Sequence, residues 1–305
     1  MNGFYKPKSR PLVLGHRGVP LAHQENTMAG FRKAVELGID GIELDVFATR
    51  DGEVVVFHDE DTERLTGVKG LISEMTWDEV SRLRVQKRIV QDDNGNYQTY
   101  GREERIPLLE EVLDELQDDL LINVEMKAYR PMWSRRKTGR LVADVIRKTG
   151  SCDRVVATSF DFFMLRDLEN DYRSIHSGFA YDDGMADGIE KWCRLLPEIG
   201  SEFSQAAGNQ NHMTFINRLL ELNAVGRMVG SSVVGVEHTL IDSDTVQKFH
   251  DRNMLVGAYT LFPYDTRTVS ASESDQMAEA RRLHELKVDW IETDDPEKLL
   301  KLYTS

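Results

Sequence analysis

Cysteine is almost absent from this 305-residue chain, which contains only Cys152 and Cys193. Neither residue belongs to a CxxC motif or to a cluster with histidine. We therefore interpret both as free buried thiols in a reducing compartment rather than as disulfide partners or zinc ligands.

Long hydrophobic runs are also missing. No stretch of about 18 consecutive apolar residues occurs, which is the length that a membrane-spanning helix requires. The first residues, MNGFYKPKSRPLVLG, lack the apolar centre of a signal peptide. We therefore predict a cytoplasmic protein without stable membrane association.

Basic residues are outnumbered. Lys and Arg total 38 against 52 Asp and Glu, which gives a formal net charge of -14. This balance argues against nucleic acid and anionic membranes as partners. It does not exclude an anionic small molecule, because a bound divalent cation can invert the local field. Composition does not indicate an oligomeric state.

What the chain does contain is a repeated alternation of short β-rich runs with longer helical patterns. This rhythm predicts a (β/α)8 TIM barrel rather than an open sheet. The β-rich runs are Leu12–His16, Gly41–Val46, Leu120–Met126, Val155–Ser159, Ser174–Ala180, Val233–Glu237, Leu255–Thr260 and Trp290–Thr293. The helical patterns are Thr27–Leu37, Leu108–Leu116, Gly139–Lys148, Phe162–Glu169, Ala186–Leu222, Ser243–Arg252, Ser274–Leu286 and Pro296–Tyr303.

One β-rich run, Glu53–His58, interrupts this rhythm. It follows the second strand directly after Asp51-Gly52, and Asp-Gly between β-formers is a strong hairpin signal. We expect the second strand to extend past the barrel rim and fold back. Residues 1–305 are therefore predicted to form one domain, with a small insertion at approximately 61–106.

A two-residue turn at Asp51-Gly52 would place Asp45 directly opposite His58. Glu43 shares the face of Asp45, because side chains alternate along a strand. The same alternation puts Glu125 near the carboxyl end of the third strand, where barrel active sites lie. Three carboxylates at neighbouring strand ends predict a site for Mg²⁺ or Ca²⁺.

The first strand ends in Gly15-His16-Arg17-Gly18. We expect His16 and His58 to act as general base and general acid, in that order, on a metal-bound phosphodiester. Arg17 or Lys127 would bind the phosphate oxygens. Taken singly, each of these residues has an ordinary structural explanation, so the prediction depends on their joint placement at one end of three successive strands.

Several motifs together resemble the glycerophosphodiester phosphodiesterase family. They are His16-Arg17-Gly18, Glu25-Asn26-Thr27, Glu43-x-Asp45, His58-Asp59 and Glu125-x-Lys127, followed at the end by VDWIETDDP. The resemblance implies a TIM barrel with metal ligands Glu43, Asp45 and Glu125 and acid/base residues His16 and His58. It also implies hydrolysis of small glycerophosphodiesters to sn-glycerol 3-phosphate and an alcohol. In this comparison Tyr259 replaces an aromatic wall of the substrate pocket, and Glu25 orients a loop.

Two other functions stay open. One is a related barrel phosphodiesterase of the phospholipase D or phosphoinositide lyase type, which acts on lipids. The other is a catalytically silent barrel used for binding. The sequence does not determine which alcohol forms the headgroup or which metal binds. It also does not determine whether water or the glycerol 2-hydroxyl attacks phosphorus.

Overall fold

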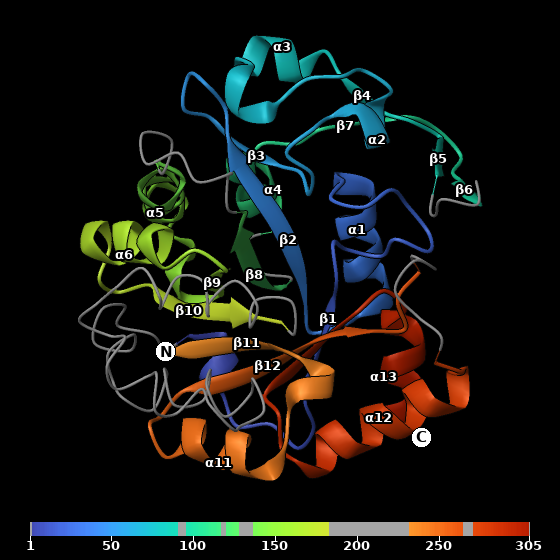
Figure 1. Ribbon diagram of the computed structural model, residues 1–305, viewed down its shortest axis with the longest axis vertical. Coiled ribbons are helices and arrows are strands. Elements are labelled where there is room, and N and C mark those ends of the chain that lie inside the picture. The colour runs from blue at the N-terminus through green and yellow to red at the C-terminus, as the bar shows by residue number, and fades with distance from the viewer. Residues whose placement is uncertain are drawn as a thin grey trace, which may run out of the picture.

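The computed structural model describes residues 2–90, 96–116, 120–127, 137–182, 232–264 and 271–304. Within these residues, eight parallel strands close into a barrel, so the predicted fold class is confirmed (Figure 1). Around the barrel the strands are β1 (Leu12–Gly15), β2 (Gly41–Ala48), β8 (Leu121–Met126), β9 (Val155–Ser159), β10 (His176–Tyr181), β11 (Val233–Glu237), β12 (Leu255–Leu261) and β13 (Trp290–Thr293), which pairs with β1 again.

Helices lie between the strands and cover the outside of the barrel. Helix α1 (Met28–Leu37) begins where Thr27 Oγ1 accepts a hydrogen bond from Gly30 N at 3.3 Å, and it ends at Gly38, whose φ is 66°. The other barrel helices are α4 (Leu109–Glu115), α5 (Thr138–Thr149), α6 (Phe162–Asp171), α11 (Ser243–His250), α12 (Glu273–Glu285) and α13 (Pro296–Thr304). The helical pattern predicted over Ala186–Leu222 lies outside the described residues.

Strand β2 shows how the alternating pattern creates a polar interior at the barrel mouth. Ile42, Leu44 and Val46 are fully buried in the main hydrophobic core that the outer helices share. Glu43 and Asp45 alternate with them and therefore point to the opposite side, into the barrel. Because neighbouring parallel strands pair in register, their inward-facing polar side chains meet at the same end of the barrel.

The other end of the barrel interior is apolar. Phe4, Leu14, Val156, Val233 and Trp290 form a separate buried cluster there. The ring of Phe4, from the 3₁₀ turn η1 (Gly3–Tyr5), meets Trp290 edge to face, with centroids 5.5 Å apart. The segment before β1 therefore closes the amino-terminal end of the barrel, and the polar groups above it have a rigid, dry base.

The predicted hairpin is present, but its register is wrong by one residue. Strand β3 (Val54–Val56) pairs antiparallel with β2 so that Val46 lies opposite Val56. Phe57 N donates to Asp45 O at 2.9 Å, so Phe57, not His58, lies opposite Asp45. The reason is a three-residue loop of residues 50–52, closed by a Thr49 N to Glu53 O bond of 2.8 Å, with Gly52 at a φ of 97°.

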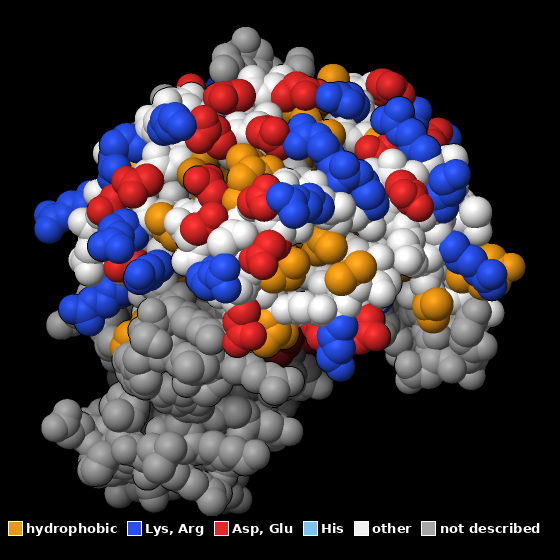
Figure 2. Space-filling view, turned by 90° about the horizontal axis from the view of Figure 1, so that it is seen from above, with side chains coloured by type: hydrophobic (Ala, Val, Ile, Leu, Met, Phe, Trp, Pro, Cys, Tyr) orange, Lys and Arg blue, Asp and Glu red, His pale blue; other side chains and the backbone are white. Residues whose placement is uncertain are grey.

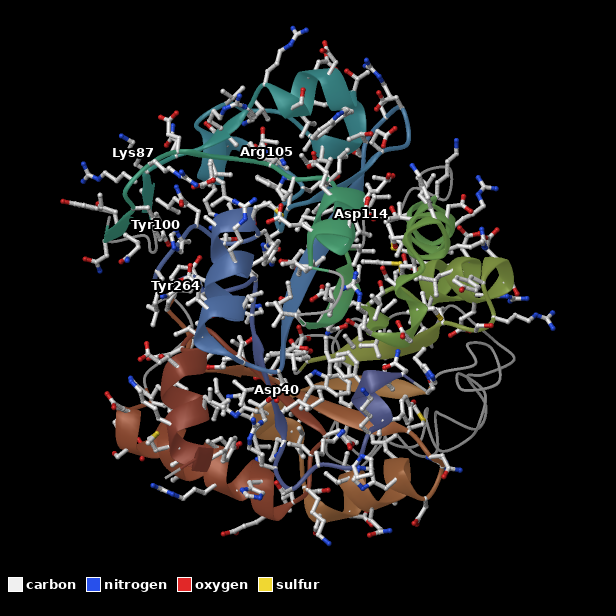
Figure 3. All side chains as sticks on the ribbon, turned by 180° about the vertical axis from the view of Figure 1, so that it is seen from behind. Asp40, Lys87, Tyr100, Arg105, Asp114 and Tyr264 are labelled. Atoms are coloured by element: carbon white, nitrogen blue, oxygen red, sulfur yellow. The ribbon has the colours of Figure 1, made fainter. Side chains whose placement is uncertain are left out.

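A small polar excursion follows the hairpin and lies beyond the ends of β2 and β3 (Figure 1). Tyr100, which lies beside α1 in Figure 3, ties it to the barrel by donating to Pro20 O at 2.8 Å. Acidic and basic side chains are interspersed over this end of the molecule (Figure 2). The excursion contains α2 (Glu63–Thr66), η2 (Ile72–Glu74), α3 (Trp77–Ser81), β4 (Arg84–Val85), β5 (Arg88–Val90), β6 (Tyr97–Thr99) and β7 (Glu104–Arg105). The boundaries of one domain over 1–305, with an insertion at about 61–106, stay a prediction.

Candidate active site

Three carboxylates meet where β2 and β8 end. These strands pair in register, with Asp45 opposite Glu125. Glu43 lies two residues before Asp45 on β2, on the same face of the strand. One oxygen from each carboxylate lies within 4.8 Å of the others. Glu43 Oε1 is buried without a hydrogen-bond partner, and Asp45 Oδ1 has only the ion pair with Lys127. Buried carboxylate oxygens grouped at this spacing form a site that suits a hard divalent cation.

The electrostatics of the three groups are not symmetrical. Burial raises the pKa of Glu43 well above its usual value, and the nearby charges of Asp45, Glu292 and Glu125 raise it further. Burial acts on Asp45 in the same direction, but the positive charge of Lys127 outweighs it, so the pKa of Asp45 lies below its usual value. Lys127 Nζ lies 3.0 Å from Asp45 Oδ1 and 2.6 Å from Glu125 Oε1.

His16 lies at the end of β1, on the rim beside Glu43. Its Nδ1 lies 2.7 Å from Asp294 Oδ1, and its Nε2 lies 3.9 Å from Glu43 Oε2. Asp294 follows β13 and is itself fixed by Tyr264 N, which donates to Asp294 Oδ2 at 2.8 Å. The imidazole is thus oriented by one carboxylate and faces a second one.

His58 reaches the site from the segment that follows β3. Its Nδ1 lies 2.6 Å from Asp59 Oδ1, which leaves Nε2 as the nitrogen that can exchange a proton with a ligand. Burial lowers the pKa of His58 to about 4, and the positive charges of Arg17 and Lys127 lower it as well. His58 is therefore a neutral imidazole near neutral pH.

A further buried carboxylate, Glu25, links the residues that hold Arg17 and His58 in place. Glu25 is 1% exposed and accepts hydrogen bonds from Arg17, Tyr264 and, twice, Arg64. Arg64 also donates to Asp59, the partner of His58. Burial raises the pKa of Glu25, but Arg64 and Arg17 lower it well below its usual value, so this carboxylate stays charged.

Arg17 itself adopts a left-handed backbone, with a φ of 55°. This turn directs Arg17 N to Glu43 Oε2 at 3.0 Å and brings its guanidinium within 3.4 Å of Asp45 Oδ2. A cation is therefore held at the edge of the three carboxylates, where an anionic ligand would approach.

The structure brings seven of the eight predicted site residues into one electrostatic neighbourhood, namely His16, Arg17, Glu43, Asp45, His58, Glu125 and Lys127. The eighth, Tyr259, lies on β12 beside Glu237 of β11. Burial raises its pKa, and among the nearby charges that of Glu125 raises it most. Their roles as catalytic, metal and substrate groups stay predictions.

Sequence reasoning did not identify Asp59, Arg64 or Asp294 as site residues. Asp59 and Asp294 lie within the quoted motifs His58-Asp59 and VDWIETDDP, so an acidic residue beside each motif was the available signal. Arg64 lies in the run DTERLTG, which also fits the family resemblance, but its contact with Glu25 joins residues 39 positions apart and was not inferred.

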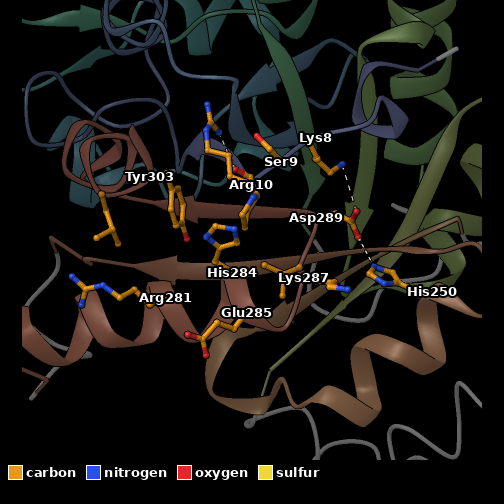
Figure 4. Close-up of a pocket in the computed structure, with 13 residues that line it drawn as sticks. Lys8, Ser9, Arg10, His250, Arg281, His284, Glu285, Lys287, Asp289 and Tyr303 are labelled. Atoms are coloured by element: carbon orange, nitrogen blue, oxygen red, sulfur yellow. Dashed lines mark hydrogen bonds and ion pairs between the residues drawn. The ribbon is translucent and has the colours of Figure 1, made fainter. Parts of the chain in front are cut away.

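A separate hollow of about 750 Å³ lies at the amino-terminal side of β12 and β13, away from the carboxylates (Figure 4). There Asp289 accepts from Val256 N at 2.8 Å and lies 2.9 Å from His250 Nε2 and 3.5 Å from Lys8 Nζ. These paired groups join the ends of neighbouring elements, so we assign them a structural role.

A known protein family and a relative of similar length both match this chain. The Glycerophosphoryl diester phosphodiesterase family matches residues 16–298, which is nearly the whole chain. A glycerophosphodiester phosphodiesterase from Caldanaerobacter subterraneus subsp. tengcongensis is 29% identical over 294 residues, covering 96% of this chain and 98% of the relative.

Solved structures show the same fold. A protein from Silicibacter pomeroyi superposes with a TM-score of 0.74 at 20% identity, over 99% of this chain and 96% of that one. A phosphodiesterase from Oleispira antarctica, in complex with the product sn-glycerol-3-phosphate, superposes with a TM-score of 0.66 at 18% identity, over 97% and 98%.

Proposed function

The chain belongs to the glycerophosphoryl diester phosphodiesterase family, and we propose that it hydrolyses glycerophosphodiesters to sn-glycerol 3-phosphate and an alcohol with the help of a divalent cation. The observation that carries the proposal is the convergence of three carboxylates with two histidines, each of which is oriented by its own aspartate. The product named for the Oleispira antarctica relative supports the choice of substrate.

Glu43, Asp45 and Glu125 would hold the cation, Mg²⁺ or Ca²⁺. The unpartnered Oε1 of Glu43 supports this, because it is a buried acceptor that the protein itself does not satisfy. When bound, the cation supplies Lewis acidity and charge neutralisation to a phosphate oxygen.

Arg17 and Lys127 would bind the phosphate and stabilise the charge that develops on its non-bridging oxygens. Both side chains lie within 3.4 Å of Asp45 oxygens and are otherwise enclosed, so their charge is strongly felt in the site. A cation at the same carboxylates would repel the Lys127 ammonium. We therefore expect Lys127 to turn from Glu125 towards the phosphate.

We assign the base role to His58 and the acid role to His16, the reverse of the order expected from the sequence. The low pKa of His58 supports a base, since a neutral imidazole can accept a proton. With His58 as the base, His16 takes the acid role, because it is the second imidazole of the site and Asp294 orients its ring.

In the proposed step, His58 and His16 each transfer one proton. His58 Nε2 takes the proton of water, or of the glycerol 2-hydroxyl, as its oxygen attacks phosphorus. The bond from phosphorus to the alcohol oxygen breaks with its electron pair, and His16 Nε2 donates a proton to that oxygen. Attack by the glycerol hydroxyl would produce a cyclic phosphate, which water then opens.

A related activity on membrane lipids, of the phospholipase D or phosphoinositide lyase type, is the alternative. Among the described residues, no helix is long and apolar enough to span a bilayer. The two substrates are compared directly by measuring turnover of glycerophosphocholine against diacylphosphatidylcholine vesicles. Faster turnover of the vesicles would overturn the proposed substrate class.

The test of the proposed function is release of glycerol 3-phosphate from glycerophosphocholine in the presence of Mg²⁺ or Ca²⁺. We expect release by the wild type and a loss of about 10²–10⁴ in turnover for His16→Ala and for His58→Ala. Unchanged turnover in either histidine variant would contradict the assignment. A complete lack of activity in the wild type would instead favour a binding barrel.

A further inference from the structure

One side of the barrel mouth has no part in the chemistry proposed above. It is formed by Phe160, which follows β9, by Glu237 at the end of β11, and by Tyr259 of β12. Glu237 and Tyr259 are direct neighbours in the parallel register. The rings of Phe160 and Tyr259 meet edge to face, with centroids 6.2 Å apart and planes at 68°. We call these three residues the aromatic–acidic wall.

The wall faces the barrel interior. Val236 and Ala258, the strand neighbours of Glu237 and Tyr259, are fully buried in the outer core, so Glu237 and Tyr259 point the other way. The Tyr259 hydroxyl donates to Tyr181 O at 2.7 Å, which fixes the ring against β10.

The wall also borders the carboxylate site. Burial raises the pKa of Tyr259 well above its usual value, and the nearby negative charges of Glu125, Glu292 and Glu237 raise it further. The phenol therefore stays neutral near neutral pH. Glu125 and Tyr259 lie near the carboxyl ends of β8 and β12, so the wall lines the same barrel mouth as the three carboxylates.

A further carboxylate, Glu292, adds negative charge beside the wall. Glu292 is 5% exposed, and its Oε1 accepts hydrogen bonds from Asn123 Nδ2 at 2.8 Å and Trp290 Nε1 at 2.9 Å. Within the described part of the chain, no hydrogen bond reaches Glu292 Oε2. This oxygen is not one of the enclosed oxygens without a partner, so it stays open to solvent or to a ligand.

The mouth is therefore electrostatically asymmetric. The cations Arg17, Arg64 and Lys127 gather on the side of β1, β2 and β8, where an anionic phosphate would lie. The side of β11 and β12 offers the aromatic rings and the Glu237 carboxylate, and Glu292 of β13 lies between the two sides, next to Leu14 of β1 in the parallel register. Aromatic faces and carboxylates both attract an organic cation, and neither has an attraction for a second anion.

We propose that the aromatic–acidic wall and Glu292 form the subsite for a cationic headgroup, an amine or quaternary ammonium on a short alcohol. The inference rests on the proposed function, since the headgroup is the alcohol that the reaction releases. The enzyme then prefers zwitterionic diesters, with the phosphate on the cationic side and the ammonium on the wall.

The same carboxylates could instead accept hydrogen bonds from the glycerol hydroxyls. The two arrangements differ in their consequences. Glycerol is common to every glycerophosphodiester, so losing a glycerol contact would slow all substrates equally. Losing a headgroup contact slows only the substrates that carry the positive charge.

The experiment compares kcat/KM for glycerophosphocholine with that for glycerophosphoglycerol, whose headgroup is neutral. We expect the wild type to favour the cationic substrate by about 10- to 100-fold. Tyr259→Leu and Glu237→Gln should each lower this ratio roughly 5- to 20-fold, mainly through KM for the cationic substrate. Tyr259→Phe keeps the ring and should keep the ratio, and Glu285→Gln, exposed on α12, is the matched charge control.

A wild-type ratio near unity, or an equal loss on both substrates in Tyr259→Leu and Glu237→Gln, would overturn the subsite. Circular dichroism and thermal melts of each variant exclude loss of folding as the cause. Binding of free choline, followed by NMR titration, separates this inference from the proposed function. Saturable binding that weakens in Tyr259→Leu supports the subsite even if no diester is hydrolysed, and no binding together with a ratio near unity contradicts it.

Discussion

Replacing Glu43 by glutamine should change stability in opposite directions with and without metal. Without a cation, Glu43 is a buried carboxylate repelled by Asp45, Glu292 and Glu125, and its pKa is raised well above the ordinary value. A group whose folded pKa is raised destabilises the fold progressively as pH rises above its unfolded pKa. Glu43→Gln removes this charge at nearly constant volume, so the variant should be more stable than the wild type in EDTA at neutral pH.

With metal the order should reverse. A cation at 100 times its dissociation constant stabilises the native state by about 2.7 kcal/mol. For a chain of 305 residues that corresponds to a rise in Tm of roughly 4 °C. Glu43→Gln lacks one ligand charge and should show a much smaller rise at the same metal concentration.

The assay is a thermal melt of the wild type, Glu43→Gln and the exposed control Glu36→Gln, in EDTA and in excess Mg²⁺ or Ca²⁺. Glu36→Gln should follow the wild type in both conditions. The reasoning is refuted if Glu43→Gln melts below the wild type in EDTA, or if the metal raises the Tm of both proteins equally.

Four further outcomes are expected. Lys127→Met should tighten metal binding in calorimetry, because an ammonium 3.0 Å from Asp45 Oδ1 is removed, while KM for the diester rises; weaker metal binding would contradict this. A diester with a nitrophenol leaving group should restore turnover in His16→Ala more than in His58→Ala, since it needs no general acid; the opposite order would return the acid role to His58. In EDTA, the wild type should lose stability as pH falls from about 6.5 to about 4, because the pKa of His58 is lowered to about 4 in the folded state. Urea titrations of His58→Ala over the same pH range should show a smaller loss of stability. Gly52→Val should lower the free energy of unfolding by about 1–2 kcal/mol, because Gly52 has a φ of 97°; an unchanged urea midpoint would show that the loop adapts.

The barrel itself could be predicted from the sequence, because each strand is a short β-rich run bounded by a helical pattern. The predicted Val155–Ser159, Val233–Glu237 and Trp290–Thr293 coincide with β9, β11 and β13. These strands are buried on both faces, so their composition is strongly constrained.

The hairpin register could not be predicted in the same way. Asp51-Gly52 fits a two-residue turn and also the end of a three-residue loop, since both place Gly at positive φ. The choice depends on tertiary contacts, such as Arg50 N donating to Met75 O at 2.8 Å and Trp77 N donating to Asp51. His58 nevertheless reaches the site, because β3 ends at Val56 and the chain turns after it.

The support of the two histidines shows a similar limit. Alternation along a strand predicts that Glu43 and Asp45 share a face, but it does not predict which side chain will orient an imidazole. Asp294 contacts His16 across 278 positions of sequence, and this contact exists only because β13 closes the barrel against β1.

The central claim is that the three carboxylates hold a divalent cation which the hydrolysis of a glycerophosphodiester requires. The most direct test is enzymatic detection of glycerol 3-phosphate released from glycerophosphocholine by the wild type, first in EDTA and then after Mg²⁺ or Ca²⁺ is restored. We predict no release in EDTA, full recovery with metal, and for Glu125→Gln recovery only at much higher metal concentration. Full release in EDTA, or the same metal requirement in Glu125→Gln as in the wild type, would contradict the account.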